Sequence, residues 1–152
     1  MKIMKILVAI NGSDSCSKVA QKAQEMALLC KGEVTFLTIL TPEYKFITSL
    51  KEYHETNELM RKKKKETEEA LEKCSMLYGQ CELTLGEKGL GTNRVVKEGN
   101  YPPQDICRYA EENNFDLIVV ADKEDTSMKN VLLGSTTEKI VRHSKVSVLV
   151  VK

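Results

Sequence analysis

The sequence predicts an α/β protein with a parallel sheet and helices on both faces. Short, unalternating runs of aliphatic residues recur along the chain, as is typical of strands buried on both sides of a parallel sheet. Segments with apolar residues at helical spacing separate these runs. Repeated to the end of the chain, this alternation predicts a doubly wound sheet of five strands. We expect one domain, residues 1–152, because a chain of this length can bury one sizeable core.

The first part of the chain reads as a strand, a helix and a second strand. Residues 5–10 are the first buried strand, and helical periodicity then runs to Gly32, which we expect to end the helix. Residues 11–14 join the strand to the helix, and Ser13 or Asp14 is the expected N-cap. Glu33–Leu40 is the second strand. A strand–helix–strand unit this short requires parallel pairing with a right-handed crossover.

The middle of the chain predicts a long charged helix over residues 57–78, after an ambiguous stretch, residues 43–56, that reads as loop with a short helical piece. The basic run at 61–65 has the composition of a nucleic-acid patch, but four glutamates follow at once and offer i,i+4 partners. We interpret the run as a solvated helix face and expect no nucleic-acid binding. Residues 79–91 hold four glycines and predict turns, with a short strand at 82–85.

The last part of the chain predicts three strands and two helices. Pro103 suits the first turn of the first of these helices, which should bury Ile106, Cys107 and Ala110. The expected segments are the strand 94–97, the helix 103–113, the strand 117–120, the helix 135–143 and the strand 146–151.

Charge and hydropathy exclude several classes of protein. The formal net charge is +1, so no overall field attracts nucleic acid or an anionic membrane. No apolar run approaches the ~20 residues of a membrane helix. The N-terminus leads directly into a strand without the pattern of a signal peptide. We therefore expect a cytoplasmic protein with no membrane contact.

The five cysteines show no metal-binding or redox motif. Their number is odd, no C-x-x-C pair occurs, and only two histidines are present, so no zinc-ligand spacing appears. Cys30, Cys74 and Cys107 fall at apolar helix positions and are expected to be small buried hydrophobes. We expect reduced thiols, and a redox- or metal-responsive role is the alternative.

One stretch, residues 116–138, combines a buried strand, a polar loop and a helix N-terminus. Free backbone N–H groups and the positive end of the helix dipole favour an anion at such a place. Gly134 and Ser135 are therefore candidate phosphate ligands. The other interpretation is a loop glycine and a capping box, in which Ser135 is the N-cap and Glu138 bonds back to its N–H. The capping box needs no ligand, and we favour it.

The chain resembles the universal stress protein family of adenine-nucleotide-binding-like α/β proteins. The resemblance covers essentially the whole chain and is carried by residues 6–13, 115–120, 132–143 and 146–151. It implies five parallel strands in the order 3-2-1-4-5 and a homodimer, often formed through the fifth strand. That strand, residues 146–151, is apolar on both faces, so pairing with a second copy would also remove an aggregation hazard.

The resemblance further implies a nucleotide site at the carboxyl ends of strands 1 and 4. ATP-binding members carry glycine, two residues, glycine, nine residues, glycine, then serine or threonine. Ala121 and Glu124 stand at the first two glycine positions, and Asn11 stands where an aspartate usually ends the first strand. The candidate nucleotide-binding residues are Asn11, Ser13, Ala121, Glu124, Gly134, Ser135 and Thr136.

These departures predict an impaired site. Glu124 adds bulk and charge to a loop that also holds Asp122 and Asp125, and a like-charge contact at ~4 Å costs roughly 1 kcal/mol in water and several times more when partly desolvated. We expect a dimeric, non-catalytic stress-response or regulatory module with no assigned cofactor, because no catalytic triad or nucleophile elbow is visible. The alternative is a variant loop, residues 121–136, that still binds ATP or AMP, with at most slow ATP hydrolysis.

Overall fold

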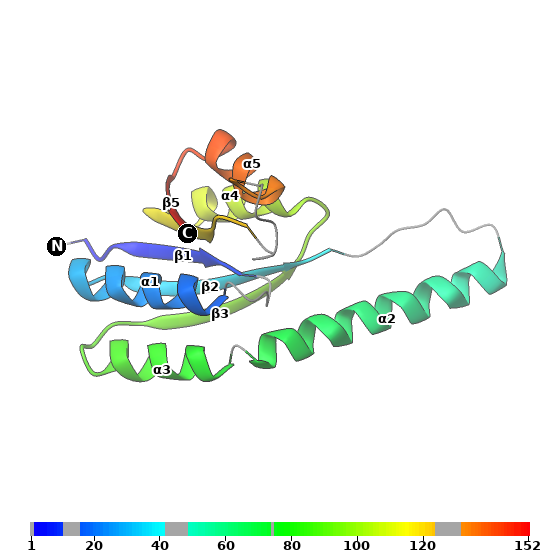
Figure 1. Ribbon diagram of the computed structural model, residues 1–152, viewed down its shortest axis with the longest axis horizontal. Coiled ribbons are helices and arrows are strands. Elements are labelled where there is room, and N and C mark those ends of the chain that lie inside the picture. The colour runs from blue at the N-terminus through cyan, green and yellow to red at the C-terminus, as the bar shows by residue number, and fades with distance from the viewer. Residues whose placement is uncertain (1, 11–15, 42–48, 74, 124–131) are drawn as a thin grey trace.

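Five parallel strands form one sheet in the order β3-β2-β1-β4-β5, which confirms the predicted fold class (Figure 1). The computed structural model describes residues 2–10, 16–41, 49–73, 75–123 and 132–152, and only the backbone of residues 63, 66, 67, 70, 71, 73, 75 and 77. The elements in chain order are β1 (Lys5–Ala9), α1 (Cys16–Cys30), β2 (Glu33–Leu40), α2 (Leu50–Lys73), α3 (Ser75–Gly86), β3 (Thr92–Glu98), α4 (Pro102–Glu112), β4 (Leu117–Ala121), α5 (Ser135–His143) and β5 (Ser147–Val151).

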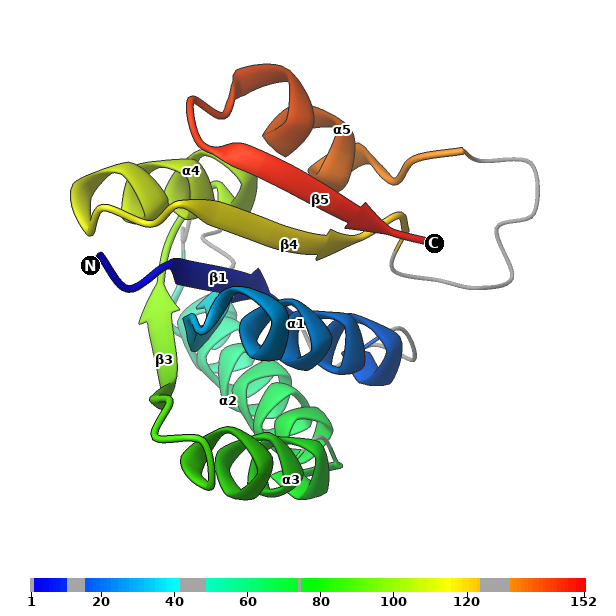
Figure 2. The ribbon, with the colours of Figure 1, turned by 90° about the vertical axis from the view of Figure 1, so that its left-hand side faces the viewer.

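The sheet separates two helical layers. Helices α1 and α3 lie on one side of it, and α4 and α5 lie on the other (Figure 2). Successive side chains of a strand point to opposite faces, so one strand supplies both layers. In β1, Ile6 and Val8 pack toward α1 and α3, whereas Leu7, between them, packs toward α4. All three side chains are fully buried, as the unalternating apolar run predicted.

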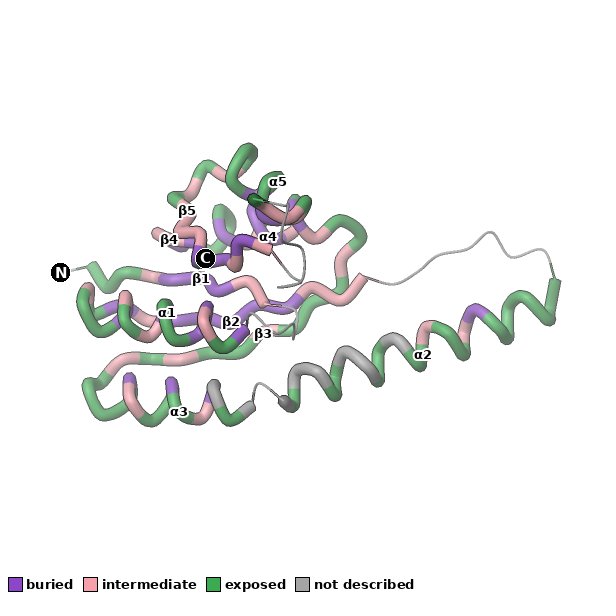
Figure 3. The backbone as a smooth tube through the Cα atoms, viewed as in Figure 1, coloured by how far each residue is buried: buried purple, intermediate pink, exposed green. Residues whose placement is uncertain are grey.

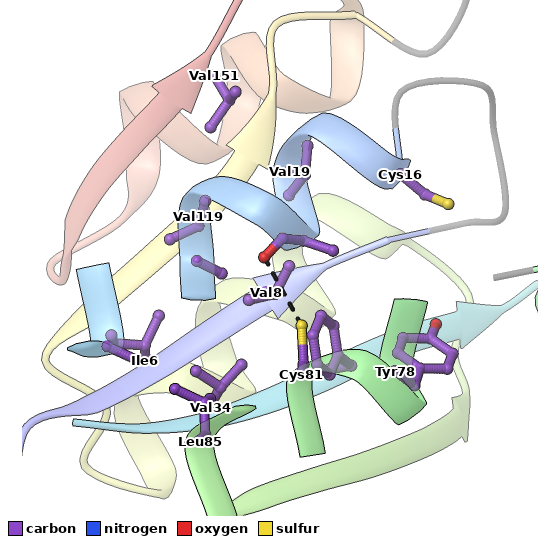
Figure 4. Packing of buried hydrophobic residues seen from close by; sticks show 14 residues of the cluster. Ile6, Val8, Cys16, Val19, Val34, Tyr78, Cys81, Leu85, Val119 and Val151 are labelled. Atoms are coloured by element: carbon purple, nitrogen blue, oxygen red, sulfur yellow. Dashed lines mark hydrogen bonds between the residues drawn. The ribbon is translucent and has the colours of Figure 1, made fainter. Parts of the chain in front are cut away.

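The core under α1 and α3 contains an aromatic pair and a buried thiol (Figure 4). The ring centroids of Phe36 on β2 and Tyr78 on α3 are 4.7 Å apart. The Sγ atom of Cys81, one turn further along α3, lies 3.9 Å from the carbonyl oxygen of Ala20 on α1. Burial raises the pKa of the Cys81 thiol, and the nearby Glu82 carboxylate adds to this effect.

Helix α3 corrects the prediction for residues 79–91. Turns and a short strand were expected there, but Ser75–Gly86 is helical, and the expected turn is found only at residues 87–89. Tyr78, Cys81 and Leu85 recur at helical spacing and are all buried. Each helical glycine costs about 1 kcal/mol relative to alanine, and burying such a face outweighs two of these penalties. The four glycines were therefore misleading, because tertiary packing overrides local propensity.

The long helix is also placed differently from the prediction. Residues 57–78 were expected to be one helix, but α2 begins already at Leu50 and ends at Lys73, and α3 starts separately at Ser75. The helical piece expected within residues 43–56 is the beginning of α2. Helix α2 runs away from the sheet, and most of its described side chains are exposed (Figures 1 and 3).

Three helices end with a residue in the left-handed region. These residues are Lys31 (φ 53°), Gly89 (φ 73°) and Asn114 (φ 57°). After each of them, the next N–H bonds back five residues, to Ala27, Leu85 and Ala110 at 2.9–3.0 Å, which is the Schellman arrangement. Gly32 was expected to end α1, but Lys31 holds the left-handed position.

Gly32 is required for a different reason. A Cβ atom at this position would lie 2.8 Å from the carbonyl oxygen of Met4. The absent side chain therefore permits close approach between the end of α1 and the chain leading into β1.

The cysteines differ from the expectation at one position. Cys30, Cys81 and Cys107 are free thiols, as expected. Cys16, buried at the start of α1, is disulfide-bonded, which contradicts the expectation of reduced thiols there. Cys74 lies outside the described residues. None of the helices in the described part of the chain combines the length and the apolar character needed to cross a bilayer.

Candidate functional site

The order in which the chain adds strands to the sheet reverses between β1 and β4. These strands are parallel neighbours, with Leu7 opposite Ile118. Helix α1 follows β1 on one side of the sheet, and α5 follows β4 on the other (Figure 2). The two connections therefore diverge at the carboxyl ends of the strands, which is where doubly wound sheets bind ligands.

Part of the predicted site lies outside the described residues. Asn11, Ser13 and Glu124 belong to the segments 11–15 and 124–131, for which the structure gives no description. The other predicted site residues, Ala121, Gly134, Ser135 and Thr136, are described. They lie at the end of β4 and the start of α5.

Two hydrogen bonds hold the start of α5 against the end of β4. The hydroxyl of Thr137 donates to the carbonyl oxygen of Ala121 at 2.6 Å. The backbone N–H of Gly134 donates to the carbonyl oxygen of Asp122 at 2.7 Å. Since Thr137 is buried, its hydroxyl needs this acceptor. The structure therefore brings Ala121 and Gly134 together, although twelve residues separate them in the sequence.

Gly134 fits this contact because it lacks a side chain. A Cβ atom there would lie 3.3 Å from the Cα atom of Lys123 and 3.6 Å from the carbonyl oxygen of Asp122. The first distance is tighter than an ordinary carbon–carbon contact, so a larger residue would push α5 away from β4. Close approach of two backbone segments thus explains this glycine without a ligand.

The predicted capping box is absent. Gly134, not Ser135, is the N-cap residue of α5, and no side chain caps the helix. The carboxylate of Glu138 accepts a hydrogen bond from Arg142, one turn further along, at 2.8 Å. The i,i+4 ion pair with arginine has replaced the expected bond to the backbone of Ser135.

The first turn of α5 offers N–H groups to an anion. The first hydrogen bond inside the helix is donated by Glu138 to Gly134 at 2.9 Å. The N–H groups of Ser135, Thr136 and Thr137 precede it and have no carbonyl partner within the helix. Ser135 is exposed and Thr136 half-buried, so this end of the helix is accessible. Such a turn attracts a negative charge through its dipole.

Asp122, whose backbone oxygen is bonded to Gly134, also carries a buried carboxylate. The side chain of Asp122 is only 11% exposed, and its Oδ1 atom accepts hydrogen bonds from the Lys123 N–H at 2.9 Å and from the Lys18 ammonium at 3.2 Å. Lys18 lies in the first turn of α1, so this ion pair joins the helix that follows β1 to the segment that follows β4. In the described part of the crevice, the Asp122 carboxylate is therefore a fixed negative charge that the Lys18 ammonium compensates.

The sequence prediction did not identify Lys18 or Thr137. Thr137 carried a usable signal, because it and Ile140 share the inward face of α5, and both are buried. Lys18 carried no usable signal in the sequence, since a lysine on the first turn of a helix is usually solvated. Its role depends on the spatial neighbourhood of β1 and β4. Among the described side chains, no group of three or more His, Cys, Asp or Glu residues is placed to hold a metal ion.

Known proteins resemble this chain along its whole length. The model of the universal stress protein family matches residues 2–152. Universal stress protein YxiE of Bacillus subtilis (strain 168) is 29% identical over 154 residues, which cover 97% of this chain and 98% of YxiE. The structure of universal stress protein UspA from Lactobacillus plantarum is similar with a TM-score of 0.77 and 22% identity, over 100% of this chain and 99% of that one. The structure of the universal stress protein from Archaeoglobus fulgidus in complex with dAMP has a TM-score of 0.61 and 19% identity, with 100% of both chains covered.

Proposed function

This chain belongs to the universal stress protein family, and from that premise we propose that it is a cytosolic, dimeric, non-catalytic stress-response module with a degenerate nucleotide site. The observation that carries this proposal is the buried Asp122 carboxylate at the end of β4. A phosphate bound at the first turn of α5 would lie close to this carboxylate, because the backbone of Asp122 is bonded directly to Gly134. The nearby sequence adds Glu124 and Asp125.

The proposal depends on electrostatic repulsion between a bound phosphate and the acidic side chains of the crevice. A like-charge contact costs roughly 1 kcal/mol in water at ~4 Å and several times more in a partly desolvated crevice. Lys18 offsets one negative charge, but Asp122 already engages it at 3.2 Å. A triphosphate would have to compete for that lysine, so we expect weak or no binding of ATP.

The first experiment is the release of bound small molecules. The purified protein is denatured and the released compounds are separated by chromatography. We expect no stoichiometric adenine nucleotide. Titration calorimetry with ATP then compares the native chain with the double variant Ala121→Gly, Glu124→Gly and with Asp122→Asn. A gain in affinity from either variant supports a site limited by bulk and charge, whereas stoichiometric nucleotide in the native protein ends the proposal.

The second candidate is an adenine-nucleotide-binding protein that uses the variant loop. The observation in its favour is the accessible first turn of α5, whose three leading N–H groups have no helical partner. A related fold occurs in a universal stress protein in complex with dAMP. A monophosphate carries less charge than ATP and would meet less repulsion from Asp122. Calorimetry with AMP beside ATP separates this candidate from the first, and slow ATP hydrolysis would show as released phosphate.

The proposed dimer would form through β5. This strand is at the edge of the sheet, and Val148, Leu149 and Val150 are each only partly buried. An open apolar edge favours pairing with a second copy. We expect a dimer in sedimentation velocity and a monomer for Leu149→Lys, with circular dichroism to show that the variant folds. Val96→Lys on β3, the other edge strand, is the matched control and should leave the dimer intact; a native monomer would remove this part of the proposal.

A further inference from the structure

A hollow of about 350 Å³ lies between α2, the start of α3 and the neighbouring strands β2 and β3. It arises because α2 runs away from the sheet instead of packing along it (Figure 1). None of the four described candidate nucleotide residues, Ala121, Gly134, Ser135 and Thr136, is among its lining residues. The lining residues are Phe36, Thr38, Glu68, Glu72, Tyr78, Arg94, Val95 and Val96.

The floor of the hollow is apolar and formed by rigid elements. Phe36 and Tyr78 contribute their paired rings, and both are buried in the core. Thr38 and Val96 are register partners on the same face of the sheet. Val96 is 54% exposed, which is high for a valine in a strand. Val96 therefore adds exposed hydrocarbon to the floor.

The wall formed by α2 is acidic. Glu68 and Glu72 are one helical turn apart, so their side chains project from the same face of α2. Both residues are exposed, and the described residues provide neither carboxylate with an ion pair. Two carboxylates opposite an apolar surface form an arrangement that a cation with a hydrocarbon portion would complete.

Arg94, the only cation among the described lining residues, does not cancel this charge. The guanidinium of Arg94 lies 4.6 Å from the ring centroid of Tyr78 and 3.1 Å from a carboxylate oxygen of Glu82. It is therefore engaged with an acid outside the lining and with the aromatic floor. No ion pair among the described side chains cancels the charges of Glu68 and Glu72, so they would repel an anion entering the hollow.

We propose that this hollow binds an organic cation with an apolar body, such as an alkylammonium ion. The ammonium group lies between Glu68 and Glu72, and the hydrocarbon chain covers Val96 and the rings of Phe36 and Tyr78. This site is independent of the crevice at β1 and β4 and does not require the proposed nucleotide chemistry.

The test is a titration followed by amide chemical shifts at constant ionic strength. The probes are hexylammonium, hexanol and hexanoate, which share the hydrocarbon chain and differ in charge. We expect saturable shifts at residues 36, 38, 78 and 94–96 with hexylammonium, much weaker binding of hexanol and none of hexanoate. Equal affinity for the three probes, or no saturable shift with hexylammonium, would overturn the proposal.

Variants identify the groups responsible. The double variant Glu68→Gln, Glu72→Gln should weaken hexylammonium binding by about tenfold, since it removes both exposed ion pairs with the ammonium group. Glu69→Gln makes the same change on the same helix outside the hollow and should leave the affinity unchanged. Val96→Lys places an ammonium group on the floor and should abolish binding in a folded protein. Native affinity in the double variant would show that the carboxylates are not ligands.

Discussion

The hydroxyl of Thr137 is bonded to the carbonyl oxygen of Ala121 at 2.6 Å, and this bond joins the first turn of α5 to the last residue of β4. It restrains the described part of the candidate site without a ligand. Both atoms would otherwise be polar groups held away from water. Thr137 therefore belongs to the support of the site, although its sequence pattern suggested a helix start only.

Replacing Thr137 by valine should test this support. The substitution keeps the shape and removes the donor, which leaves the Ala121 carbonyl without its hydroxyl partner. We expect the free energy of unfolding in urea to fall by about 1–2 kcal/mol. Thr136→Val is the matched control, because Thr136 is more exposed. Equal losses for the two variants would show that the hydrogen bond is not the cause.

Asp116 should make stability depend on pH. Its carboxylate accepts the Lys5 N–H at 2.9 Å and the Lys2 ammonium at 3.2 Å, and these bonds, the first more than the second, lower the pKa of Asp116 below its ordinary value of 3.8. A lowered pKa in the folded state stabilises the fold above the ordinary pKa, and this stabilisation is lost as the pH falls through the folded value.

The variant Asp116→Asn isolates that contribution. At pH ~7 we expect the free energy of unfolding to fall by up to about 1 kcal/mol, and the difference from the native chain should shrink as the pH falls below the ordinary pKa of 3.8. Denaturant titrations over this pH range give the measurement. Glu112→Gln, an exposed residue on α4, should show no such trend. A loss that stays constant with pH would contradict the ionic origin.

Lys31 and Gly32 should respond to substitution in opposite directions. Lys31 occupies the left-handed region at φ 53°, which costs a side-chain-bearing residue roughly 1 kcal/mol. Lys31→Gly is expected to raise thermal stability by up to about 1 kcal/mol. Gly32→Ala should lower it, because the new Cβ would lie 2.8 Å from the Met4 carbonyl oxygen. Calorimetry of both variants checks the pair, and stabilisation by Gly32→Ala would refute this account.

The disulfide at Cys16 should make the protein sensitive to reductant. Breaking it is expected to lower the free energy of unfolding by about 2–4 kcal/mol. Urea denaturation with and without dithiothreitol measures this, and Cys107→Ser provides a control at a free thiol. In the cytosol such bonds are normally reduced, so an effect would support the redox-responsive alternative. Identical curves in both conditions would remove it.

The fold was largely predictable because its inner strands β1, β2 and β4 are buried on both faces. The run from Leu117 to Val120 has no other stable placement in an α/β protein. The prediction for residues 79–86 was wrong because it gave the glycines more weight than the helical spacing of Tyr78, Cys81 and Leu85. Packing against α1 and the sheet decides between the two interpretations.

The candidate site was predictable in position and not in its contacts. Strand order places the crevice at the ends of β1 and β4, and Gly134 follows from the loop pattern. The pairing of Lys18 with Asp122 joins residues far apart in sequence, and no local pattern contains it. The prediction of a capping box was wrong because the Glu138 carboxylate pairs with Arg142 at i,i+4 spacing.

The left-handed helix ends at Lys31, Gly89 and Asn114 have a consequence for engineering and divergence. Each leads into a strand at the rim of the sheet opposite the crevice, and each is closed by its own backbone hydrogen bond. That rim fixes where β2, β3 and β4 begin without help from any bound molecule. Loops on the crevice side can therefore be lengthened, shortened or grafted from a relative while the scaffold keeps its geometry.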